Sequence, residues 1–363
     1  MAGRFCIACG GSGGHLFPGL AVAERLHARG HQVRLYISTK SVDARIMEGY
    51  PQFEAHILPA IGWPGFGFRI ISFAWRLWKA RQMCLREVSD FHPHGVLAMG
   101  GFTSVAPLWA ALAKGIPSFI HEANTIPGKV TREFARKVQE VFLAFDETSE
   151  RLKGSHCTTV GMPLRQCFQR IPREVAARQL GLDPQRRTLI ILGGSQGAVS
   201  LNGCMRDSLE FLTPFMKDWQ VIHLTGADQD ATMREAYLQR NIPAVVYPFS
   251  HDMCAIYSLA DLAVSRCGAS SLAEVSFFGL PTLLVPYQHA ADDHQSVNAS
   301  VYARAGAALI YDERYHPLEN FRRHLLDLLE KEDLRQELAQ ASANLNHPDA
   351  ADAVVKELEH VIS

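Results

Sequence analysis

A glycine-rich stretch near the N-terminus carries the first residues that could do chemistry. Four glycines fall within residues 10–14, and His15 follows them directly. The pattern predicts a glycine turn over residues 10–19, before a helix that begins at Leu20. Glycine lets the backbone adopt positive φ and come close to a ligand. Such a turn directs backbone N–H groups and a helix N-terminus at the ligand, which favours anionic or phosphate-bearing groups. An imidazole at position 15 can reach the same ligand; the alternative is an ordinary turn with a solvent-facing histidine.

A second candidate site lies within residues 265–274. Gly268–Ser271 follows an apolar run and opens a helix, so it can present N–H and hydroxyl donors to phosphate. Glu274 lies one turn further along and can accept from sugar hydroxyls, although a solvated acid near a helix start has the same pattern. This combination suits a nucleotide diphosphate sugar. Another glycine turn, at 193–198, repeats the N-terminal pattern and is a weak signal alone.

A nicotinamide dinucleotide fits these residues less well. Neither 10–14 nor 193–198 reads G-x-G-x-x-G in full, and no acid ends the strand predicted at 33–37. An acid at that place is what binds the adenosine ribose in dinucleotide sites. We therefore expect no cofactor.

Two polar stretches complete the candidate residues. His121–Asn124 follows an apolar run, and its side chains either orient a hydroxyl nucleophile or cap the core. The second stretch, residues 286–299, contains side chains of metal-ligating type: His289, Asp292, Asp293 and His294. Because the two carboxylates are adjacent and no supporting pattern surrounds them, we predict a loop that contacts sugar and phosphate rather than a metal site.

The elements that must position these residues alternate between short apolar runs and helical patterns. Apolar runs lie at 5–9, 33–38, 53–58, 95–99 and 118–121, and again at 188–192, 221–226, 244–247, 262–265 and 282–286. This alternation predicts an α/β fold with parallel sheets and with ligands at the carboxyl ends of the strands. We expect two Rossmann-like domains facing across a cleft, over residues 1–163 and 164–345. A final helix, within 346–363, is expected to pack back on the first domain.

Composition narrows the class of protein. The chain has 363 residues, of which 47% are hydrophobic and 20% charged, as in globular proteins of two domains. Its formal net charge of -1 gives no basic field, so no nucleic-acid partner is expected. Of the eight cysteines, Cys6 and Cys9 are separated by two residues, but this spacing within a predicted strand puts them on opposite faces. The cysteines therefore favour reduced, buried thiols in a cytosolic protein. We expect neither a signal peptide nor a membrane span.

Residues 61–82 depart from this alternation. Three of the five tryptophans lie here, basic residues are interleaved with them, and no acid occurs from Gly62 to Arg86. A basic, aromatic helix with a glycine-rich approach suits the surface of an anionic membrane. The alternative is a core helix whose basic residues face water. Because the glycine loop carries aromatics where turns are normally polar, we favour the membrane surface.

Seven motifs, taken together and in this order, resemble the MurG family of peptidoglycan glycosyltransferases. They span residues 10–19, 99–104, 121–128, 160–165, 193–198, 266–274 and 286–299. The resemblance implies GT-B architecture and inverting, metal-independent transfer of N-acetylglucosamine from UDP-GlcNAc to lipid I, an undecaprenyl-diphosphate-linked acceptor, giving lipid II. It also implies a peripheral position on the cytoplasmic face of the cell membrane.

Individual residues acquire expected roles from the same resemblance. The expected substrate contacts are Ser12, Gly13, Gly14, Asn124, Arg165, Ser195, Ser250, Ala269, Ser270, Ser271, Leu272, Glu274 and Gln295. Residues 269–274 would hold the diphosphate and ribose, with Glu274 on the ribose, and Gln295 would contact N-acetylglucosamine. Ser12 stands where threonine is commoner. Ser250, in the loop expected to hold the uracil, stands where an apolar residue is usual.

The reacting hydroxyl needs a base. His15 is the candidate by type and location, and Glu122 is either the base itself or the group that orients His15. The first glycine loop would then serve the acceptor. Two other functions stay open from the sequence: another GT-B enzyme that uses a UDP-sugar, such as a diacylglycerol glycosyltransferase or a UDP-GlcNAc 2-epimerase, and a non-catalytic sensor of nucleotide sugars.

Overall fold

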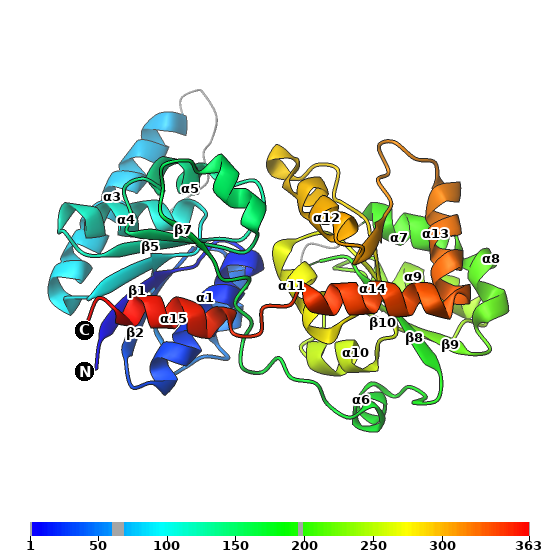
Figure 1. Cartoon of the computed structure of the whole chain (residues 1–363). Helices are drawn as coiled ribbons and strands as arrows, with labels where there is room; N and C mark the ends of the chain where they lie inside the picture. The colour runs from blue at the N-terminus through cyan, green and yellow to red at the C-terminus, as the bar shows by residue number, and fades with distance from the viewer. Residues whose placement is uncertain (1, 60–68, 195–198, 363) are drawn as a thin grey trace. The chain divides into compact units, whose positions relative to one another are not determined.

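The computed structural model describes residues 2–59, 69–194 and 199–362. The chain forms two compact units, each built on its own sheet (Figure 1). The first unit contains residues 1–166 and 347–363, and the second contains residues 167–346. The division falls just after the boundary expected at residue 163, and the chain returns to the first unit at the start of the expected C-terminal segment.

The first unit is a seven-stranded parallel sheet with the order β3-β2-β1-β4-β5-β6-β7. Its strands are β1 (Arg4–Ala8), β2 (Gln32–Ile37), β3 (Glu54–Ile57), β4 (Gly95–Ala98), β5 (Ser118–Glu122), β6 (Glu140–Leu143) and β7 (Cys157–Thr159). The predicted parallel α/β fold is confirmed. Strand order reverses between β1 and β4, and ligands of such sheets bind beyond the carboxyl ends of the strands at that point.

Helices cover both faces of this sheet. They are α1 (Gly13–Ala28), α2 (Ser41–Met47), α3 (Arg69–Phe91), α4 (Val105–Ala113), α5 (Lys129–Phe134) and α15 (Ala350–Glu359), with short 3₁₀ turns at Phe102–Ser104 and Asp146–Arg151. Alternate residues of β1 point to opposite faces. Cys9 packs with α1 and α15, and Cys6 packs with α3 and α4, as their spacing predicted. Both cysteines are fully buried free thiols.

Helix α15 packs on α1 although more than 300 residues separate them in sequence. Val354 and Leu358 of α15 are fully buried in the same core as β1. Burying such side chains contributes roughly 1.5–3 kcal/mol each. Arg29, just after α1, donates to Asp352 at 2.7 Å and to Glu359 at 2.8 Å. Because these ion pairs are half-exposed, they orient α15 but add little to the free energy of unfolding.

Helix α1 begins earlier than the glycine pattern indicated. The sequence predicted a glycine turn through residue 19, whereas the helix begins at Gly13 and contains Pro18. In the turn, only Gly11 has positive φ, at 115°. Gly19 is required for packing, because a Cβ on it would stand 2.4 Å from the Cβ of Cys9. Glycine therefore allows this helix to lie close to β1, and His15 belongs to its first turn.

The second unit is a six-stranded parallel sheet with the order β10-β9-β8-β11-β12-β13. Its strands are β8 (Arg187–Leu192), β9 (Trp219–Leu224), β10 (Ala244–Tyr247), β11 (Leu262–Ser265), β12 (Thr282–Leu284) and β13 (Ala308–Ile310). Its helices are α6 (Arg173–Leu180), α7 (Val199–Arg206), α8 (Leu209–Leu212), α9 (Asp230–Leu238), α10 (Met253–Leu259), α11 (Ala269–Phe278), α12 (His294–Arg304), α13 (Leu318–Glu330) and α14 (Glu332–Asn344), with 3₁₀ turns at Thr213–Phe215 and Ala291–Asp293.

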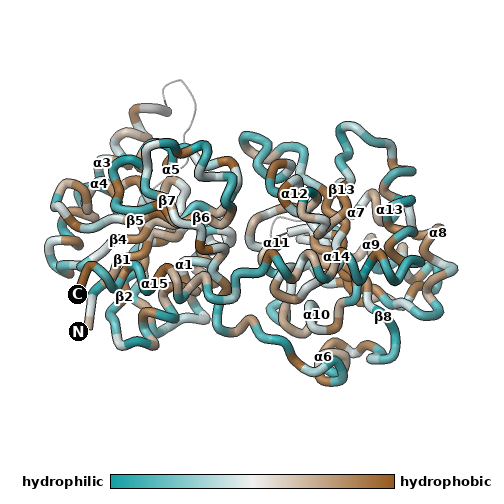
Figure 2. The backbone as a smooth tube through the Cα atoms, viewed as in Figure 1, coloured by the Kyte–Doolittle hydropathy of each residue, from teal (hydrophilic) through white to brown (hydrophobic). Residues whose placement is uncertain are grey.

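The core of the second unit has the continuous apolar strands typical of a parallel sheet covered on both faces. Leu189 and Ile191 of β8 are completely buried, together with Leu262 and Val264 of β11. Figure 2 shows the hydrophobic residues concentrated in the strands of both sheets. Here the strand order reverses between β8 and β11. The loops after these two strands therefore occupy the position at which a ligand is expected.

Candidate active site

A buried carboxylate holds the loop after β1. Asp43 is fully buried, and its Oδ2 accepts from the backbone N–H groups of Gly11 at 2.8 Å and Ser38 at 2.9 Å, and from the Ser38 hydroxyl at 2.6 Å. A Cβ on Gly10 would stand 2.2 Å from the nitrogen of Ser38. The first glycines thus serve packing within the protein. Asp43 lies five residues after the strand predicted at 33–38, and residue type and spacing alone do not distinguish it from a surface acid.

His15 lies between the two loops that follow β1 and β4. Its Nδ1 is 3.0 Å from the hydroxyl of Ser12. A Cβ on Gly100 would stand 3.4 Å from its Nε2, and one on Gly101 would stand 3.2 Å from its Cε1. Both glycines have positive φ, of 86° and 71°. Glycine at these positions therefore makes room for the imidazole as well as for the turn.

The N-terminus of α1 keeps its backbone donors available. Ser12 stands at the N-cap in an extended conformation, but its side chain makes no capping hydrogen bond and contacts His15 instead. The first turn contains no acidic residue. The leading N–H groups of a helix have no partner within the helix, so those of Gly13 and Gly14 suit an anionic group.

Glu122 organises its own loop. It ends β5, is only 5% exposed, and accepts from the backbone of Asn124 at 3.0 Å, the backbone of Gly128 at 2.9 Å and the hydroxyl of Thr131 at 2.5 Å. These bonds engage both carboxylate oxygens. Burial raises the pKa of Glu122, and the three hydrogen bonds oppose that rise. The carboxylate of Glu122 is thus engaged within its own loop, whereas the imidazole of His15 contacts the hydroxyl of Ser12.

His121 is a buried, neutral histidine beside the site. Its Nε2 lies 2.9 Å from the carbonyl oxygen of Gly161, which acts as the acceptor. Burial, with a smaller contribution from His15, lowers the pKa of His121 to about 4, and the hydrogen bond to Gly161 opposes this fall. Gly161 has a φ of 84°, and a Cβ on it would stand 2.2 Å from that of His347. The hydrogen bond of His121 therefore connects β5 with Gly161, which lies close to His347, where the chain re-enters the first unit.

Asn124 and Arg165 both belong to the first unit. The carbonyl of Asn124 accepts from the hydroxyl of Thr148 at 3.1 Å, which fixes the loop after β5. The guanidinium of Arg165 lies 4.2 Å from the ring centre of Phe17 in α1, and its Nη1 is 3.3 Å from the hydroxyl of Tyr50. The sequence analysis placed Arg165 in the second domain; the structure groups it with residues 1–166.

The loop after β11 leads into the N-terminus of α11. Gly268 stands at the N-cap with extended backbone, no side-chain cap is made, and the first turn contains no acid. The hydroxyl of Ser270 is buried and has no hydrogen-bond partner among the described residues. Ala269 is buried and can offer only its backbone, and Ser271 is half-buried. The buried Leu272 already donates its backbone N–H to the carbonyl of Gly268 at 3.0 Å, so the structure does not support the predicted contact through that group. This arrangement can bind phosphate oxygens without a metal.

Glu274 lies on α11 one turn beyond these donors. Its side chain is half-buried, and its Oε2 accepts from the hydroxyl of Tyr257 at 2.7 Å. Tyr257 belongs to α10 and is only 2% exposed. The glutamate is thus a carboxylate held in place at the edge of this turn, and the alternative of a solvated helix acid does not describe it.

Arg266 is a buried residue whose hydrogen bonds stabilise the loop after β11. It is 5% exposed; its Nη1 donates to the carbonyls of Val285 at 3.0 Å and Pro286 at 3.1 Å and to Glu313 at 2.9 Å. Its Nη2 donates to the hydroxyl of Ser200 at 2.6 Å. Only tertiary contacts show this role, because these partners come from distant parts of the chain.

Gln295 joins two strand ends. Its Oε1 accepts from the backbone N–H groups of Cys267 at 3.1 Å and Tyr287 at 3.0 Å, so the amide NH₂ is the group it can present to a ligand. Just before it, Asp292 and Asp293 both have positive φ, at 51° and 54°. Ion pairs and hydrogen bonds from Arg314 to Asp293, Asp312 and Ser296 hold this strained turn.

Two expected contacts lie in loops of the second unit. The hydroxyl of Ser250 accepts from the backbone N–H of Asp252 at 3.0 Å, so this side chain serves its own turn between β10 and α10. The neighbouring Phe249 is 54% exposed and offers an aromatic face there. Ser195 lies outside the described residues.

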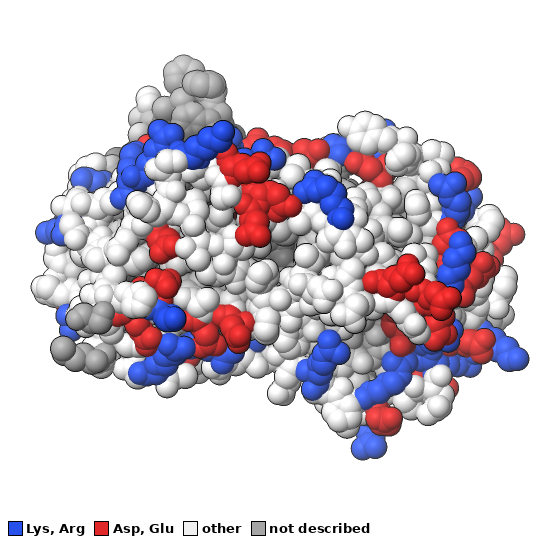
Figure 3. Space-filling view, viewed as in Figure 1, with Lys and Arg blue, Asp and Glu red and all other residues white. Residues whose placement is uncertain are grey.

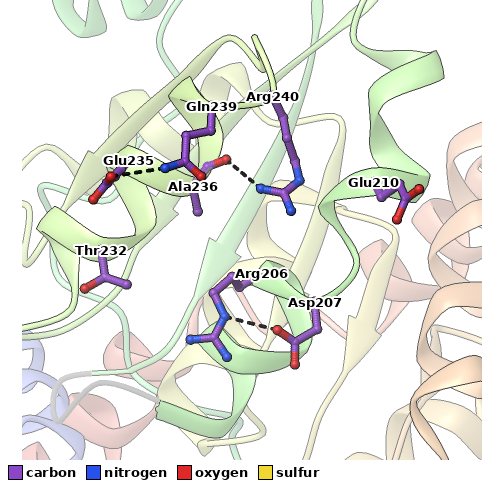
Figure 4. Close-up of a pocket in the computed structure, with 8 residues that line it drawn as sticks. All are labelled: Arg206, Asp207, Glu210, Thr232, Glu235, Ala236, Gln239 and Arg240. Atoms are coloured by element: carbon purple, nitrogen blue, oxygen red, sulfur yellow. Dashed lines mark hydrogen bonds and ion pairs between the residues drawn. The ribbon is translucent and has the colours of Figure 1, made fainter.

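A separate pocket lies away from these loops. It has a volume of about 400 Å³ and is lined by Arg206, Asp207, Glu210, Thr232, Glu235, Ala236, Gln239 and Arg240 (Figure 4). These residues come from the C-terminal end of α7, from α8, and from α9 and the residues just after it. Arg206 pairs with Asp207 at 3.0 Å, Gln239 donates to Glu235 at 3.1 Å, and Arg240 donates to the carbonyl of Ala236 at 3.4 Å. Within the described residues no cluster of three or more metal-ligating side chains occurs, at this pocket or elsewhere.

Helix α3 carries an exposed aromatic face. Ile71, Trp75 and Trp78 are 72%, 58% and 58% exposed, and their spacing puts them on one side of the helix. Phe73 and Ala80 are buried on the other side. In Figure 3, Lys and Arg side chains gather around the part of the first unit where Figure 1 shows α3 and α5. Among the described residues, no helix is both long and apolar enough to cross a membrane. Residues 60–68 lie outside the description.

The chain matches two family models, one for each half. The N-terminal domain of glycosyltransferase family 28 matches residues 5–143, and the C-terminal domain of the same family matches residues 188–354. Among solved structures, the chain is similar to MurG of Acinetobacter baumannii, with a TM-score of 0.78, 26% identity and coverage of 99% of this chain and 100% of that one. It is also similar in fold to an Arabidopsis thaliana glycosyltransferase complexed with UDP-L-rhamnose, with a TM-score of 0.70, 16% identity and coverage of 99% of each chain.

Curated relatives match along almost the full length. A UDP-N-acetylglucosamine--N-acetylmuramyl-(pentapeptide) pyrophosphoryl-undecaprenol N-acetylglucosamine transferase from Hahella chejuensis is 34% identical over 98% of both chains. The enzyme of the same name from Syntrophus aciditrophicus is 32% identical, again over 98% of both chains. These matches confirm the predicted family and the predicted GT-B fold. The chain belongs to the MurG family of N-acetylglucosamine transferases, within glycosyltransferase family 28.

Proposed function

We propose that the chain transfers N-acetylglucosamine from UDP-GlcNAc to the C4 hydroxyl of N-acetylmuramic acid in lipid I, giving lipid II. The observation that carries this proposal is the full-length match to curated relatives whose names state that transfer. The phosphate-binding turn of the second unit and the imidazole of the first supply the two kinds of group that the reaction needs.

The donor would bind to the second unit. Backbone N–H groups of residues 269–271 and the hydroxyls of Ser270 and Ser271 lie at the start of α11 and would hold the diphosphate. The buried, unpartnered hydroxyl of Ser270 supports this assignment, because such a group needs an acceptor. Glu274 would accept from the ribose, the 248–252 loop that contains Ser250 would hold the uracil, and the amide of Gln295 would donate to the sugar.

The acceptor would bind to the first unit. The N-terminus of α1 offers the N–H groups of Gly13 and Gly14 to the lipid diphosphate. His15 stands in the same turn, so an acceptor held by its diphosphate would bring a sugar hydroxyl near the imidazole. The absence of acidic residues from the first turn of α1 favours an anionic ligand there.

His15 would be the catalytic base. For Nε2 to take the proton, Nδ1 must carry the ring proton, and the Ser12 hydroxyl 3.0 Å away would accept the hydrogen bond from it. The C4 oxygen attacks the anomeric carbon as its proton passes to Nε2, and the bond from that carbon to the UDP oxygen breaks on the opposite face. Glu122 is the poorer candidate for the base, since its oxygens are engaged within its own loop.

UDP leaves with additional negative charge that the protein must stabilise. The first-turn amides of α11 point at this charge and would strengthen their hydrogen bonds as it develops. Arg165 and Asn124 would contribute from the first unit, as the family resemblance implies. The guanidinium of Arg165 already lies over the ring of Phe17, 4.2 Å from its centre.

The aromatic face of α3 would hold the enzyme against the cytoplasmic face of the membrane that carries the acceptor. Ile71, Trp75 and Trp78 are exposed, and Arg76 and Lys79 are exposed beside them. Tryptophan rings prefer the headgroup region of bilayers, and basic side chains add attraction to anionic lipids. The association is peripheral in this proposal.

Transfer of labelled N-acetylglucosamine from UDP to a short-chain lipid I analogue tests the function. We expect a lipid II product whether or not a chelator is present. Diacylglycerol serves as the control acceptor and should give no product. Transfer to diacylglycerol in place of lipid I, or epimerisation of the donor without transfer, would overturn the proposal.

A further inference from the structure

A buried tyrosine contacts the carboxylate that the proposed function assigns to the ribose. The hydroxyl of Tyr257 lies 2.7 Å from Oε2 of Glu274. Tyr257 is 2% exposed whereas Glu274 is half-buried. The tyrosine can therefore act on a bound nucleotide only through the glutamate.

Aromatic packing fixes the ring of Tyr257. It stacks on Phe278 with ring centres 5.1 Å apart and an angle of 18°, and Phe168 lies against it at 6.2 Å. The segment that carries Phe168 is itself bound to α10, because Ile171 donates from its backbone to the hydroxyl of Ser258 at 3.1 Å. The phenol oxygen is thus held in one place before any ligand binds.

The phenol is suited to be a permanent donor. Burial and the neighbouring charge of Glu274 raise the pKa of Tyr257 well above its ordinary value, so the hydroxyl keeps its proton. A hydrogen bond donated to a carboxylate is stronger than one between neutral groups. A carboxylate offers roughly four acceptor positions, so Glu274 can bind Tyr257 and ribose hydroxyls together.

We propose that Tyr257 is a positioning residue for the donor nucleotide, which fixes the Glu274 carboxylate so that it meets the ribose hydroxyls without reorganising. Because Tyr257 belongs to α10, the helix that follows the 248–252 loop, it would also link the ribose contact to the proposed uracil contact. This inference rests on the assignment of Glu274 to the ribose in the proposed function.

The test compares two nucleotides in the full-length chain. Binding of UDP and of a UDP analogue that lacks both ribose hydroxyls is measured by calorimetry for the wild type and Tyr257→Phe. We expect Tyr257→Phe to weaken UDP binding about tenfold and to change binding of the analogue by less than about twofold. In turnover, the KM for UDP-GlcNAc should rise about as much while kcat stays within about twofold.

Tyr302→Phe is the matched control. Tyr302 is also buried, and its hydroxyl lies 2.8 Å from that of Ser276, on the same helix α11. Its loss removes a buried tyrosine hydrogen bond to α11 without touching Glu274. We expect a similar fall in thermal stability for the two variants but a UDP affinity within about twofold of the wild type for Tyr302→Phe.

The remaining outcomes overturn one assignment or the other. Equal weakening of both nucleotides by Tyr257→Phe, or no weakening of UDP, would show that Tyr257 is only a structural residue. If the wild type binds UDP and the analogue equally, the assignment of Glu274 to the ribose fails, and the role of Tyr257 fails with it. A failure to act on lipid I would overturn the proposed acceptor and leave these binding measurements valid.

Discussion

The hydroxyl of Ser12 lies 3.0 Å from Nδ1 of His15, and the imidazole is enclosed by the glycine loop that follows β4. The first of these contacts engages one ring nitrogen of the proposed base, and the second limits the space around its imidazole.

Removing the hydroxyl in Ser12→Ala should lower kcat about tenfold, because the imidazole loses the contact that selects its tautomer. His15→Ala should cost more, about 10²- to 10⁴-fold, since the base itself is gone. Ser12→Thr keeps a hydroxyl and should retain most of the activity. Steady-state transfer to a lipid I analogue checks the order, and a His15→Ala enzyme with normal turnover would refute the assignment of the base.

Gly101→Ala should lower kcat at least about tenfold, because the new methyl group would press on the imidazole of His15 and misplace the base. Gly115→Ala is the control for positive φ: Gly115 has a φ of 66°, close to the 71° of Gly101, but nothing lies within 4 Å of its added Cβ. Gly101→Ala should also cost more stability than a change at a left-handed helical position, because Gly101 has a ψ of 171°, in a region open essentially to glycine alone. Equal activities for the two variants would argue against the steric role of Gly101.

Asp43→Asn should destabilise the first unit by about 1–3 kcal/mol, because an amide cannot accept all three hydrogen bonds that Oδ2 now accepts. Since Gly11 is one of the donors, kcat should fall as well. Asp146→Asn changes an exposed aspartate and should do neither. Urea denaturation and transfer assays measure the two effects. An Asp43→Asn enzyme of normal stability would show that the buried carboxylate does not hold the loop.

His121 should make the first unit sensitive to acid. Its folded pKa of about 4 lies below the ordinary 6.5, so the unfolded chain binds more protons between these values. Its contribution to stability is complete above pH 6.5 and is lost as the pH falls toward 4, by on the order of 3 kcal/mol. His121→Gln should flatten this part of the pH profile of thermal unfolding, whereas His360→Gln, at an exposed position, should leave it unchanged.

Replacing Trp75 and Trp78 together by serine should weaken binding to anionic vesicles about tenfold or more, because both rings leave the lipid interface. Leu238→Ser removes an apolar side chain that is 74% exposed in the second unit and should have no effect on binding. Turnover with a short-chain acceptor in detergent should stay near the wild-type rate for both proteins. Vesicle sedimentation gives the readout, and unchanged binding of the double variant would rule out this face of α3.

The sequence determined the layers and the places of the loops. Alternating apolar runs and helical patterns are local, and a parallel sheet puts every strand end at one edge, so the positions of His15 and of residues 268–274 followed before any coordinates. At α1 the glycines led to a wrong prediction of where the helix begins. They indicated a turn through residue 19, but Gly19 serves the contact of α1 with Cys9, and such a contact cannot be read from neighbouring residues.

Only the tertiary structure decided which side chain meets which. Asp43 reaches Gly11, Tyr257 reaches Glu274 and Arg266 reaches Glu313 from elements far apart in the sequence. Glu122 looked like a candidate base by type, yet its bonds to Gly128 and Thr131 engage it in its own loop. The physical reason is that residue type and local period fix what a group can do, whereas burial and hydrogen-bond partners, which arise when distant elements pack, fix what it does.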